Sequence, residues 1–414
     1  MRRILEKKGD GIVETVSKRF SNYLLISSLG GNIIGSLFVL FLSSTKGFSA
    51  KEISLIVGTT PLIIFPIFFI WGSVLDKYKK VIWFSKLVNL SNIITMMMLI
   101  FTDNFRIFFI INLLRSILLQ PGGTLNDKYL LNISKINRGS YGNLRVRSTI
   151  GYGLAGIVSS ISIKLGDVYL AMSVGMVLIF ISIILINKIP EMPNDNIENY
   201  KGNELVKENL NKSIANLLKN KLYIKYLIII SIIWGTQNAA SGYGIQIMMI
   251  DLNASKEIIG LIPFIMVIFE VIFLLIYDKI RILKKVDTAL VISLLILILR
   301  WGIMLFAKSY LTILLITMLH GIVTGIVLQI QNKLIGEIVP SNQHFLAFII
   351  ISSLSNTILP SILNLITGSL YENMGIWIFG GCYLVLTLIA IFIMMFTIIK
   401  NKFKFKKIDA KFNL

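Results

Sequence analysis

Long apolar segments separated by short polar ones dominate the pattern of this chain. The segments are about twenty residues long, the length that an α-helix needs to cross a bilayer. The pattern predicts twelve such helices, near residues 23–43, 52–75, 81–101, 105–121, 145–164, 168–187, 222–245, 257–277, 286–306, 309–331, 344–367 and 376–399. The sequence therefore predicts an all-α polytopic membrane protein with twelve transmembrane helices.

One long polar segment, rich in Asn, Lys and Glu, interrupts this pattern between the sixth and seventh helices. Six helices on either side of a cytoplasmic loop are typical of a transporter built from two related halves. We expect an N-terminal half over residues 1–189, a loop over 190–221 whose second part forms a surface helix, and a C-terminal half over 222–414 with a basic tail.

Composition and charge support a membrane location. The chain is 55% hydrophobic and 15% charged, with a mean hydropathy of +0.79, which excludes an ordinary soluble domain. Most Lys and Arg residues fall on segments that are cytoplasmic if the helices alternate from a cytoplasmic N-terminus. We expect an integral protein of the bacterial inner (cytoplasmic) membrane, with both termini cytoplasmic and no cleavable signal peptide.

The net charge of +20 suggests that the protein binds an anionic partner, either lipid or nucleic acid. Because the cations cluster at one side of the predicted membrane, we expect anionic lipid of the inner leaflet as the partner, and no nucleic acid. The single cysteine, Cys382, excludes an internal disulfide and a Cys-based metal site.

Three charged or titratable residues lie within apolar segments of the second half. Glu270, Arg300 and His320 fall in three successive predicted helices. Such residues are costly in a membrane and by default mark a substrate path or a proton relay. An apolar environment favours the neutral form of a carboxyl group, so Glu270 is suited to load and release a proton. We therefore assign these three residues to proton coupling.

Glu270 has only apolar residues one turn away on its own helix, so its partner must come from another helix. Arg300 and His320 are the candidates, and a purely structural buried ion pair is the alternative. His320 shares one helical stripe with Thr317, Thr324 and Gln331, which leaves a polar cavity and a satisfied core histidine equally open.

The first half offers Asp127, just past the fourth predicted helix, and Arg145, at the start of the fifth. Ordinary interfacial charges explain both equally well on spacing. Arg115 lies inside the fourth helix among apolar neighbours.

The seventh predicted helix has a polar face formed by Trp234, Gln237, Asn238 and Ser241. An aromatic and amide surface of this kind suits a hydroxylated or planar ligand. A hydrogen-bonded contact with a neighbouring helix is the alternative.

A weak internal repeat follows the second and eighth helices. Gly72, Asp76 and Lys77 begin the first loop, and Asp278 begins the second; in both, an Asp at a helix end precedes a cluster of cations. We predict that each Asp forms charged hydrogen bonds that latch one conformational state. Anchoring by inside-positive charge is the alternative.

No enzyme signature stands out in the sequence. There is no Gly-Lys-Ser or Gly-Lys-Thr phosphate loop, no Cys/His metal cluster and no nucleophile elbow. We expect no enzyme activity, no cofactor and no metal. Without an ATP site, uphill transport would depend on an ion gradient.

At these residues the chain resembles the major facilitator superfamily, and more narrowly its lactose-permease-like and phenylpropionate-permease-like proton symporters. Glu270, Arg300 and His320 stand in the order of that family's helix 8 Glu, helix 9 Arg and helix 10 His. Asp127 and Tyr141-Gly142 with Arg145 resemble its end of helix 4 and start of helix 5. The resemblance implies that Asp127 and Arg145 contact substrate, and that the trio links proton movement to it.

The chain also departs from the sugar-transporting members of that family. Val323 replaces a second carboxylate, Thr317 replaces a Lys, and Gln237 and Asn238 stand near acidic positions of helix 7. The phenylpropionate-like branch fits better in this respect, and Arg147 adds a cation that would suit an anionic substrate.

The sequence thus predicts a monomeric secondary transporter that works by alternating access. We expect uptake of a small organic solute, such as a sugar, nucleoside or aromatic acid, together with a proton. An efflux antiporter for drugs or metabolites is the alternative with the same fold. A non-transporting receptor would need no titratable residues within the membrane.

Overall fold

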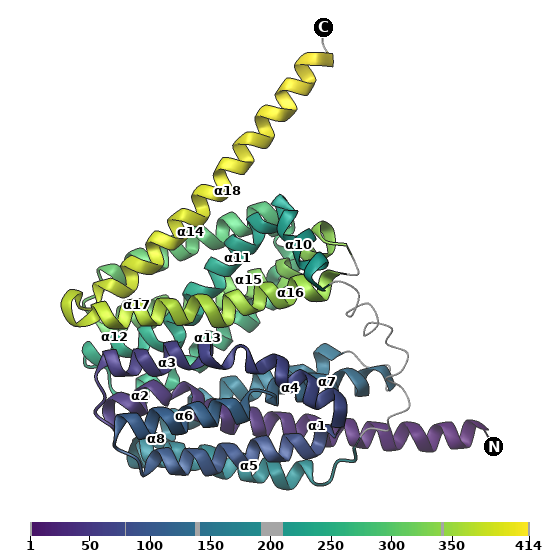
Figure 1. Ribbon diagram of the computed structural model, residues 1–414, viewed down its shortest axis with the longest axis vertical. Helices are drawn as coiled ribbons and strands as arrows, with labels where there is room; N and C mark the ends of the chain where they lie inside the picture. The colour runs from purple at the N-terminus through teal and green to yellow at the C-terminus, as the bar shows by residue number, and fades with distance from the viewer. Residues whose placement is uncertain (1, 79, 137–140, 192–209, 341–342, 413–414) are drawn as a thin grey trace. The chain divides into compact units, whose positions relative to one another are not determined.

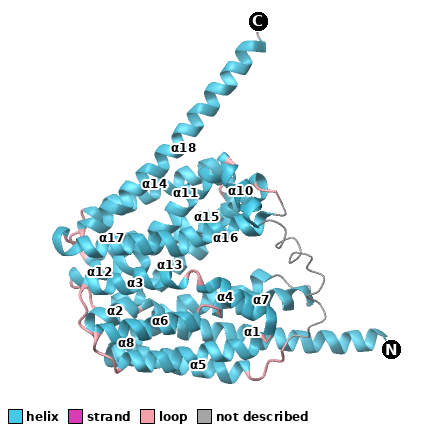
Figure 2. Ribbon diagram, in the orientation of Figure 1, coloured by secondary structure: helices cyan, strands magenta, loops and turns pink. Residues whose placement is uncertain are grey.

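The computed structural model describes residues 2–78, 80–136, 141–191, 210–340 and 343–412. Throughout these residues the regular secondary structure is helical, and Figure 2 shows no strand among them. The chain divides into two compact units, one of Met1–Tyr200 with Asn253–Val267 and the other of Lys201–Leu252 with Ile268–Leu414. The all-α prediction is therefore confirmed for the described part of the chain.

The first unit consists of helices joined by short connections (Figure 1). They are α1 (Arg2–Ser36), α2 (Phe38–Ser44), α3 (Ala50–Ile64), α4 (Ile67–Tyr78), α5 (Val81–Ile100), α6 (Phe105–Leu119), α7 (Gly122–Ile136), α8 (Tyr141–Ile186) and the first part of α13 (Lys256–Ile276). The second predicted helix, 52–75, is broken between α3 and α4 next to Pro66. Proline lacks the N–H that an uninterrupted helix requires, which accounts for the break.

Helix α8 contains two predicted membrane helices in one assigned element. Its apolar part, Arg145–Ile186, has 42 residues, which at about 1.5 Å per residue would measure about 63 Å, roughly twice the hydrocarbon thickness of a bilayer. The backbone leaves helical geometry at Gly166 and at Asp167, whose φ is 69°. This break separates the segments predicted over 145–164 and 168–187.

Both arms of α8 pack closely on α1 through glycines. A Cβ atom at Gly151 would lie 2.6 Å from the Leu25 carbonyl oxygen, and one at Gly30 would lie 2.7 Å from the Gly175 carbonyl oxygen. Side chains at these positions would force the backbones apart. Small residues at helix contacts permit this approach in membranes, where no hydrophobic driving force acts between helices.

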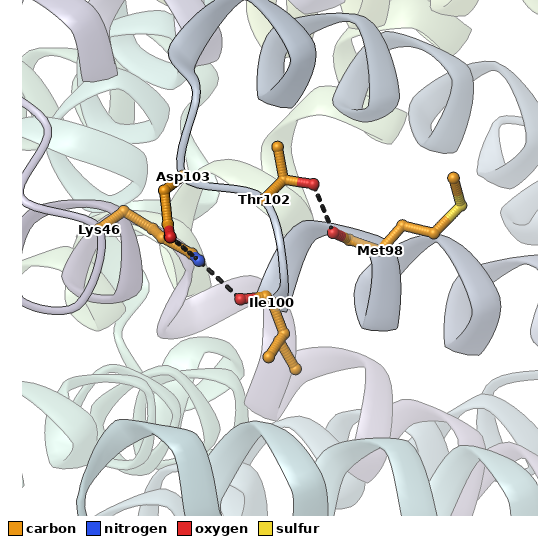
Figure 3. Close-up of polar contacts among 5 residues, drawn as sticks. All are labelled: Lys46, Met98, Ile100, Thr102 and Asp103. Atoms are coloured by element: carbon orange, nitrogen blue, oxygen red, sulfur yellow. Dashed lines mark hydrogen bonds and ion pairs between the residues drawn. The ribbon is translucent and has the colours of Figure 1, made fainter.

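A buried lysine ties the connection after α2 to the end of α5 (Figure 3). Lys46 Nζ donates to the Ile100 carbonyl oxygen at 2.6 Å and pairs with Asp103 Oδ1 at 2.7 Å. The Lys46 side chain is 1% exposed, whereas that of Asp103 is 89% exposed. The lysine therefore satisfies a carbonyl that the end of a helix leaves without an intrahelical partner.

The second unit contains the remaining helices. They are α10 (Leu210–Lys219), α11 (Lys221–Ala239), α12 (Ile245–Asp251), the second part of α13, α14 (Val286–Leu305), α15 (Tyr310–Ile338), α16 (His344–Ser353), α17 (Leu359–Met374) and α18 (Trp377–Phe412). Helix α10 lies where the sequence predicts a surface helix. The preceding residues 192–209 of the predicted loop lie outside the described part of the chain.

Two π-helical turns interrupt the second unit. Ala240–Gly244 joins α11 to α12, and Leu354–Ile358 joins α16 to α17. Each pair is therefore one helix with a local irregularity, matching the predictions over 222–245 and 344–367. Turns of this kind occur frequently at functional sites.

Nine helical segments in the described residues are long and apolar enough to cross a membrane. One of them is the double-length Arg145–Ile186. The broken α3 and α4 and the interrupted α11 and α12 are absent from these nine. The polytopic helical prediction is confirmed, and the full count of twelve remains a prediction.

Candidate functional site

A buried arginine, Arg300, links three helices of the second unit. It lies on α14 and is 0% exposed. Its Nη1 donates to Gln237 Oε1 of α11 at 3.3 Å and lies 3.5 Å from His320 Nδ1 of α15. For Arg300 to donate to the histidine, Nδ1 must carry no hydrogen, which places the proton of the neutral ring on Nε2. Arg300 and His320 are thus brought together as the sequence suggests.

Glu270 lies on the same stripe of α13 as Pro263 and Met266, at helical spacing, and is half-buried. Its backbone carbonyl faces Gly325 of α15: a Cβ atom at Gly325 would lie 3.3 Å from that oxygen. Among the described residues, no hydrogen bond or ion pair joins the Glu270 carboxylate to Arg300 or His320. Arg300, which the sequence proposes as a charge partner of Glu270, instead contacts the neutral groups of Gln237 and His320.

The polar stripe predicted on α15 is present. Thr317, Thr324 and Gln331 are buried, and His320 is half-buried between them. Thr324 Oγ1 is buried without a hydrogen-bond partner among the described residues, whereas Gln331 Oε1 accepts from Trp234 Nε1 at 3.0 Å. The stripe therefore combines satisfied and unsatisfied polar groups.

The polar residues of α11 contact three different neighbours. Trp234 reaches α15, Gln237 reaches Arg300 on α14, and Asn238 reaches the π-helical turn 354–358. This arrangement corresponds to the hydrogen-bonded helix contact that the sequence left open. Trp234 and Asn238 are half-buried and Gln237 is 0% exposed, so a role in substrate binding stays a prediction.

Asn238 connects the two π-helical regions. Its Nδ2 donates to the Ser355 carbonyl oxygen at 3.2 Å and to Asn356 Oδ1 at 2.9 Å. It lies two residues before the turn 240–244 and bonds directly to the turn 354–358. One side chain thus fastens the irregular part of one helix to that of another.

In the first unit, Asp127 and Arg145 lie close together. Arg145 Nη1 is 3.8 Å from Asp127 Oδ1, and both side chains are about half exposed. The contact joins α7 to the start of α8, and the predicted role of both residues in substrate binding stays a prediction. Arg147, two residues further along α8, is exposed.

Arg115 has a partner that the sequence did not suggest. Its Nε and Nη2 donate to Asn92 Oδ1 of α5 at 3.2 and 3.0 Å, and its guanidinium carbon lies 5.6 Å from the centroid of the Phe38 ring. An amide oxygen therefore receives the side edge of this guanidinium. Asn92 lies in an apolar helix, and no spacing rule relates it to Arg115.

The predicted latch residues fall where side chains are not described. Gly72, Asp76 and Lys77 lie in α4, and Asp278 lies in the short 3-10 turn Tyr277–Lys279 after α13. Gly72 is in the middle of α4, and Asp76 and Lys77 are in its last turn, so all three are helical where the sequence predicts a loop. The latch itself stays a prediction.

Comparison with known proteins identifies the family. The MFS_1 like family matches residues 23–379. The chain belongs to this family. Its members, and the solved structures that share this fold, are transporters and not enzymes. The predicted membership of the major facilitator superfamily is thereby confirmed.

Individual relatives are distant. The "Uncharacterized transporter YwbF" of Bacillus subtilis (strain 168) is 22% identical over 341 residues, covering 81% of each chain. The nucleoside transporter NupG matches with a TM-score of 0.75 at 15% identity, over 92% of this chain and 98% of that one. A D-xylose-proton symporter matches with a TM-score of 0.66 at 14% identity, over 92% and 97%. These structures share the family fold with this chain.

Proposed function

We propose that this transporter takes up a small polar or weakly acidic organic solute together with a proton. The observation that carries the proposal is Glu270, a carboxyl group in the apolar helix α13 that has no cationic partner among the described residues. A charged carboxylate in such surroundings is costly, and protonation removes the cost. Glu270 is therefore a suitable proton carrier.

Arg300 and His320 supply the second element of the proposed coupling. They lie on α14 and α15, and α15 also contacts the backbone of α13 at Glu270 through Gly325. If α13 shifts along α15, the ionised carboxylate gains attraction to a nearby buried cation in one state and loses it in the other. The proton would then bind in one state and leave in the other, which is the requirement for symport.

The substrate would contact the pair Asp127 and Arg145 and the polar face of Trp234, Gln237 and Asn238. A carboxylate, a guanidinium and amides can bind hydroxyl groups, ring nitrogens or a carboxyl group. Nucleosides and D-xylose are the solutes named for two proteins with this fold. We extend this class, as a proposal, to sugars, nucleosides and aromatic acids.

We also propose an oligomeric state, a membrane and an orientation for the transporter. The transporter would work as a monomer in the bacterial inner membrane, with both termini cytoplasmic and its basic segments on anionic lipid. Asp76 and Asp278, with Gly72 and Lys77, would latch one conformational state.

Uptake by proteoliposomes tests the proposal. Purified protein is first screened for solutes that raise its melting temperature, and the best solute is then offered under an imposed inward proton gradient. Wild type should accumulate it, whereas Glu270→Gln should exchange solute without accumulating it. Glu372→Gln, an exposed carboxylate near the end of α17, is the matched control and should behave as wild type.

Two outcomes contradict the proposal. Full gradient-driven accumulation by Glu270→Gln would remove its role in coupling. Solute movement outward against an inward proton gradient would identify an efflux antiporter in place of a symporter.

A further inference from the structure

Arg300 is a buried cation whose charge no described residue balances. Its two neighbours, Gln237 and His320, are neutral, and no carboxylate in the described part of the chain lies within ion-pair distance. A guanidinium stays protonated in proteins. A buried charge without a partner of opposite charge is strongly destabilising. A buried cation without a balancing charge is expected to bind an anion.

The hydrogen bonds of Arg300 leave one particular edge of the guanidinium unused. Nη1 contacts Gln237 and His320, whereas Nε and Nη2 are buried without a partner in the described residues. Nε and Nη2 form the side edge, whose two parallel N–H bonds match the two oxygens of a carboxylate. The free edge therefore has the geometry for bidentate binding of a carboxylate.

Two further donors without partners in the described residues lie on side chains that contact Arg300, those of Gln237 and Trp301. Gln237, 0% exposed, has an unpaired Nε2 although its Oε1 receives Arg300. Trp301 Nε1 is likewise buried and unpaired, and the Trp301 ring lies 4.5 Å from the Arg300 guanidinium carbon. Tyr383 is buried beside Trp301, with the two ring centroids 5.1 Å apart. Unpaired N–H groups beside a buried cation are what an anion requires.

Arg115 shows that the protein can satisfy a buried arginine by itself. The same Nε and Nη2 edge of Arg115 donates to Asn92 Oδ1. In Arg300 the amide oxygen of Gln237 receives Nη1, and the corresponding Nε and Nη2 edge has no partner in the described residues. The contrast separates a structural arginine in the first unit from an arginine with a free binding edge in the second.

We infer that Arg300 Nε and Nη2, with Gln237 Nε2, bind a monovalent carboxylate group carried by the transported solute. This inference rests on the proposed transport function for the identity of the ligand as the solute, and it narrows the solute to a carboxylic acid. The same N–H groups could donate hydrogen bonds to a chloride ion. Chloride is therefore the other small monovalent anion that the test must distinguish from a carboxylate.

Thermal unfolding of the purified full-length protein tests the site without any gradient. The melting temperature is followed in detergent with the bulky sulfonate MES as the only anion, and acetate, benzoate or chloride is then titrated at constant ionic strength. Wild type should show a saturable rise with a carboxylate. Arg300→Gln should raise the half-saturating concentration about tenfold or more, as expected for loss of a charge-assisted hydrogen bond.

Gln237→Glu gives a second, independent result, because it places a carboxylate beside Arg300. It should melt at a higher temperature than wild type in MES and should no longer respond to added carboxylate. Arg115→Gln is the matched control: it also removes a buried arginine and should keep the wild-type response. These results would stand even if Arg300→Gln failed to fold.

Equal responses in wild type, Arg300→Gln and Gln237→Glu would overturn the inference, because they would show a general salt effect. Saturation by chloride without saturation by either carboxylate would overturn the assignment to a solute. Glu270→Gln is titrated as well, since an internal carboxylate that competed for Arg300 would mask the response in wild type. Because no proton gradient is involved, failure here is distinguishable from failure of proton coupling.

Discussion

Gly325 of α15 lies directly against the backbone of Glu270 on α13. A Cβ atom at Gly325 would be 3.3 Å from the Glu270 carbonyl oxygen and 2.9 Å from the Cβ of Phe273. The distance between the two helices at this point is therefore set by the absence of a side chain. This approach also fixes how far Glu270 lies from the polar stripe of α15.

Gly325→Ala should lower the stability of the second unit by about 1–3 kcal/mol, the usual range for an added methyl group in a packed contact. It should also impair proton-coupled uptake, because α13 moves away from α15. The melting temperature in detergent and uptake by proteoliposomes measure the two effects. Gly302→Ala is the control, since nothing lies within 4 Å of its added Cβ. Identical melting of both variants would contradict the prediction.

Asp127 and Arg145 should matter for transport and little for stability. Their atoms are 3.8 Å apart and their side chains are 45% and 58% exposed, and pairs of this kind contribute less than about 1 kcal/mol. Asp127→Asn and Arg145→Gln should melt close to wild type but reduce uptake about tenfold or more through lost substrate contacts. Lys333→Gln, from the exposed pair with Glu337 at 3.9 Å, should affect neither. Normal uptake by both variants would remove the pair from the binding site.

Lys46 and Asp103 should contribute unequally although they form one ion pair. Lys46→Met removes the donor to the Ile100 carbonyl as well as the charge pair, so we expect a loss of about 1–3 kcal/mol. Asp103→Asn leaves the carbonyl bond in place, and its side chain is in solvent. Its melting temperature should therefore stay near that of wild type. Equal destabilisation by the two variants would mean that the ion pair dominates the contact.

Asn238 should hold the two π-helical regions together. Asn238→Ala removes the donor to the Ser355 carbonyl and to Asn356 Oδ1, and leaves the part-buried carbonyl of Ser355 without this donor. We expect a loss of about 1–3 kcal/mol, measured by thermal unfolding. Asn373→Ala, at an exposed position near the end of α17, serves as the control. Unchanged melting of Asn238→Ala would show that helix packing suffices without this bond.

The helices could be predicted from the sequence because their signals are local. Apolar length located the spans, although the break between α3 and α4 at Pro66 falls inside the single helix predicted over 52–75. The break at Asp167 was also predictable in position, because a 42-residue apolar stretch exceeds one bilayer crossing. The π-helical turns were not, since Ala240–Gly244 differs in no obvious way from neighbouring helical residues.

Partners across helices were harder to predict than the helices. The sequence singled out Arg300 and His320, which lie together, because charges in apolar segments are rare. It proposed Glu270 as a partner of Arg300 and did not suggest Gln237, which contacts Arg300 in the structure. The choice depends on helix rotation and crossing, which contacts such as that between Gly325 and Phe273 determine. Asn92 as the partner of Arg115 was missed for the same reason.

The two π-helical turns have a consequence for comparing this chain with its relatives. In each turn the closing bond runs from residue i+5, from Ile245 N to Ala240 O and from Leu359 N to Leu354 O, so each turn holds one residue more than an α-turn. Every later side chain on that helix is rotated by about 100°. A relative with unbroken helices should therefore align with a one-residue gap at each place. An alignment without these gaps would match inward-facing positions of one protein with outward-facing positions of the other.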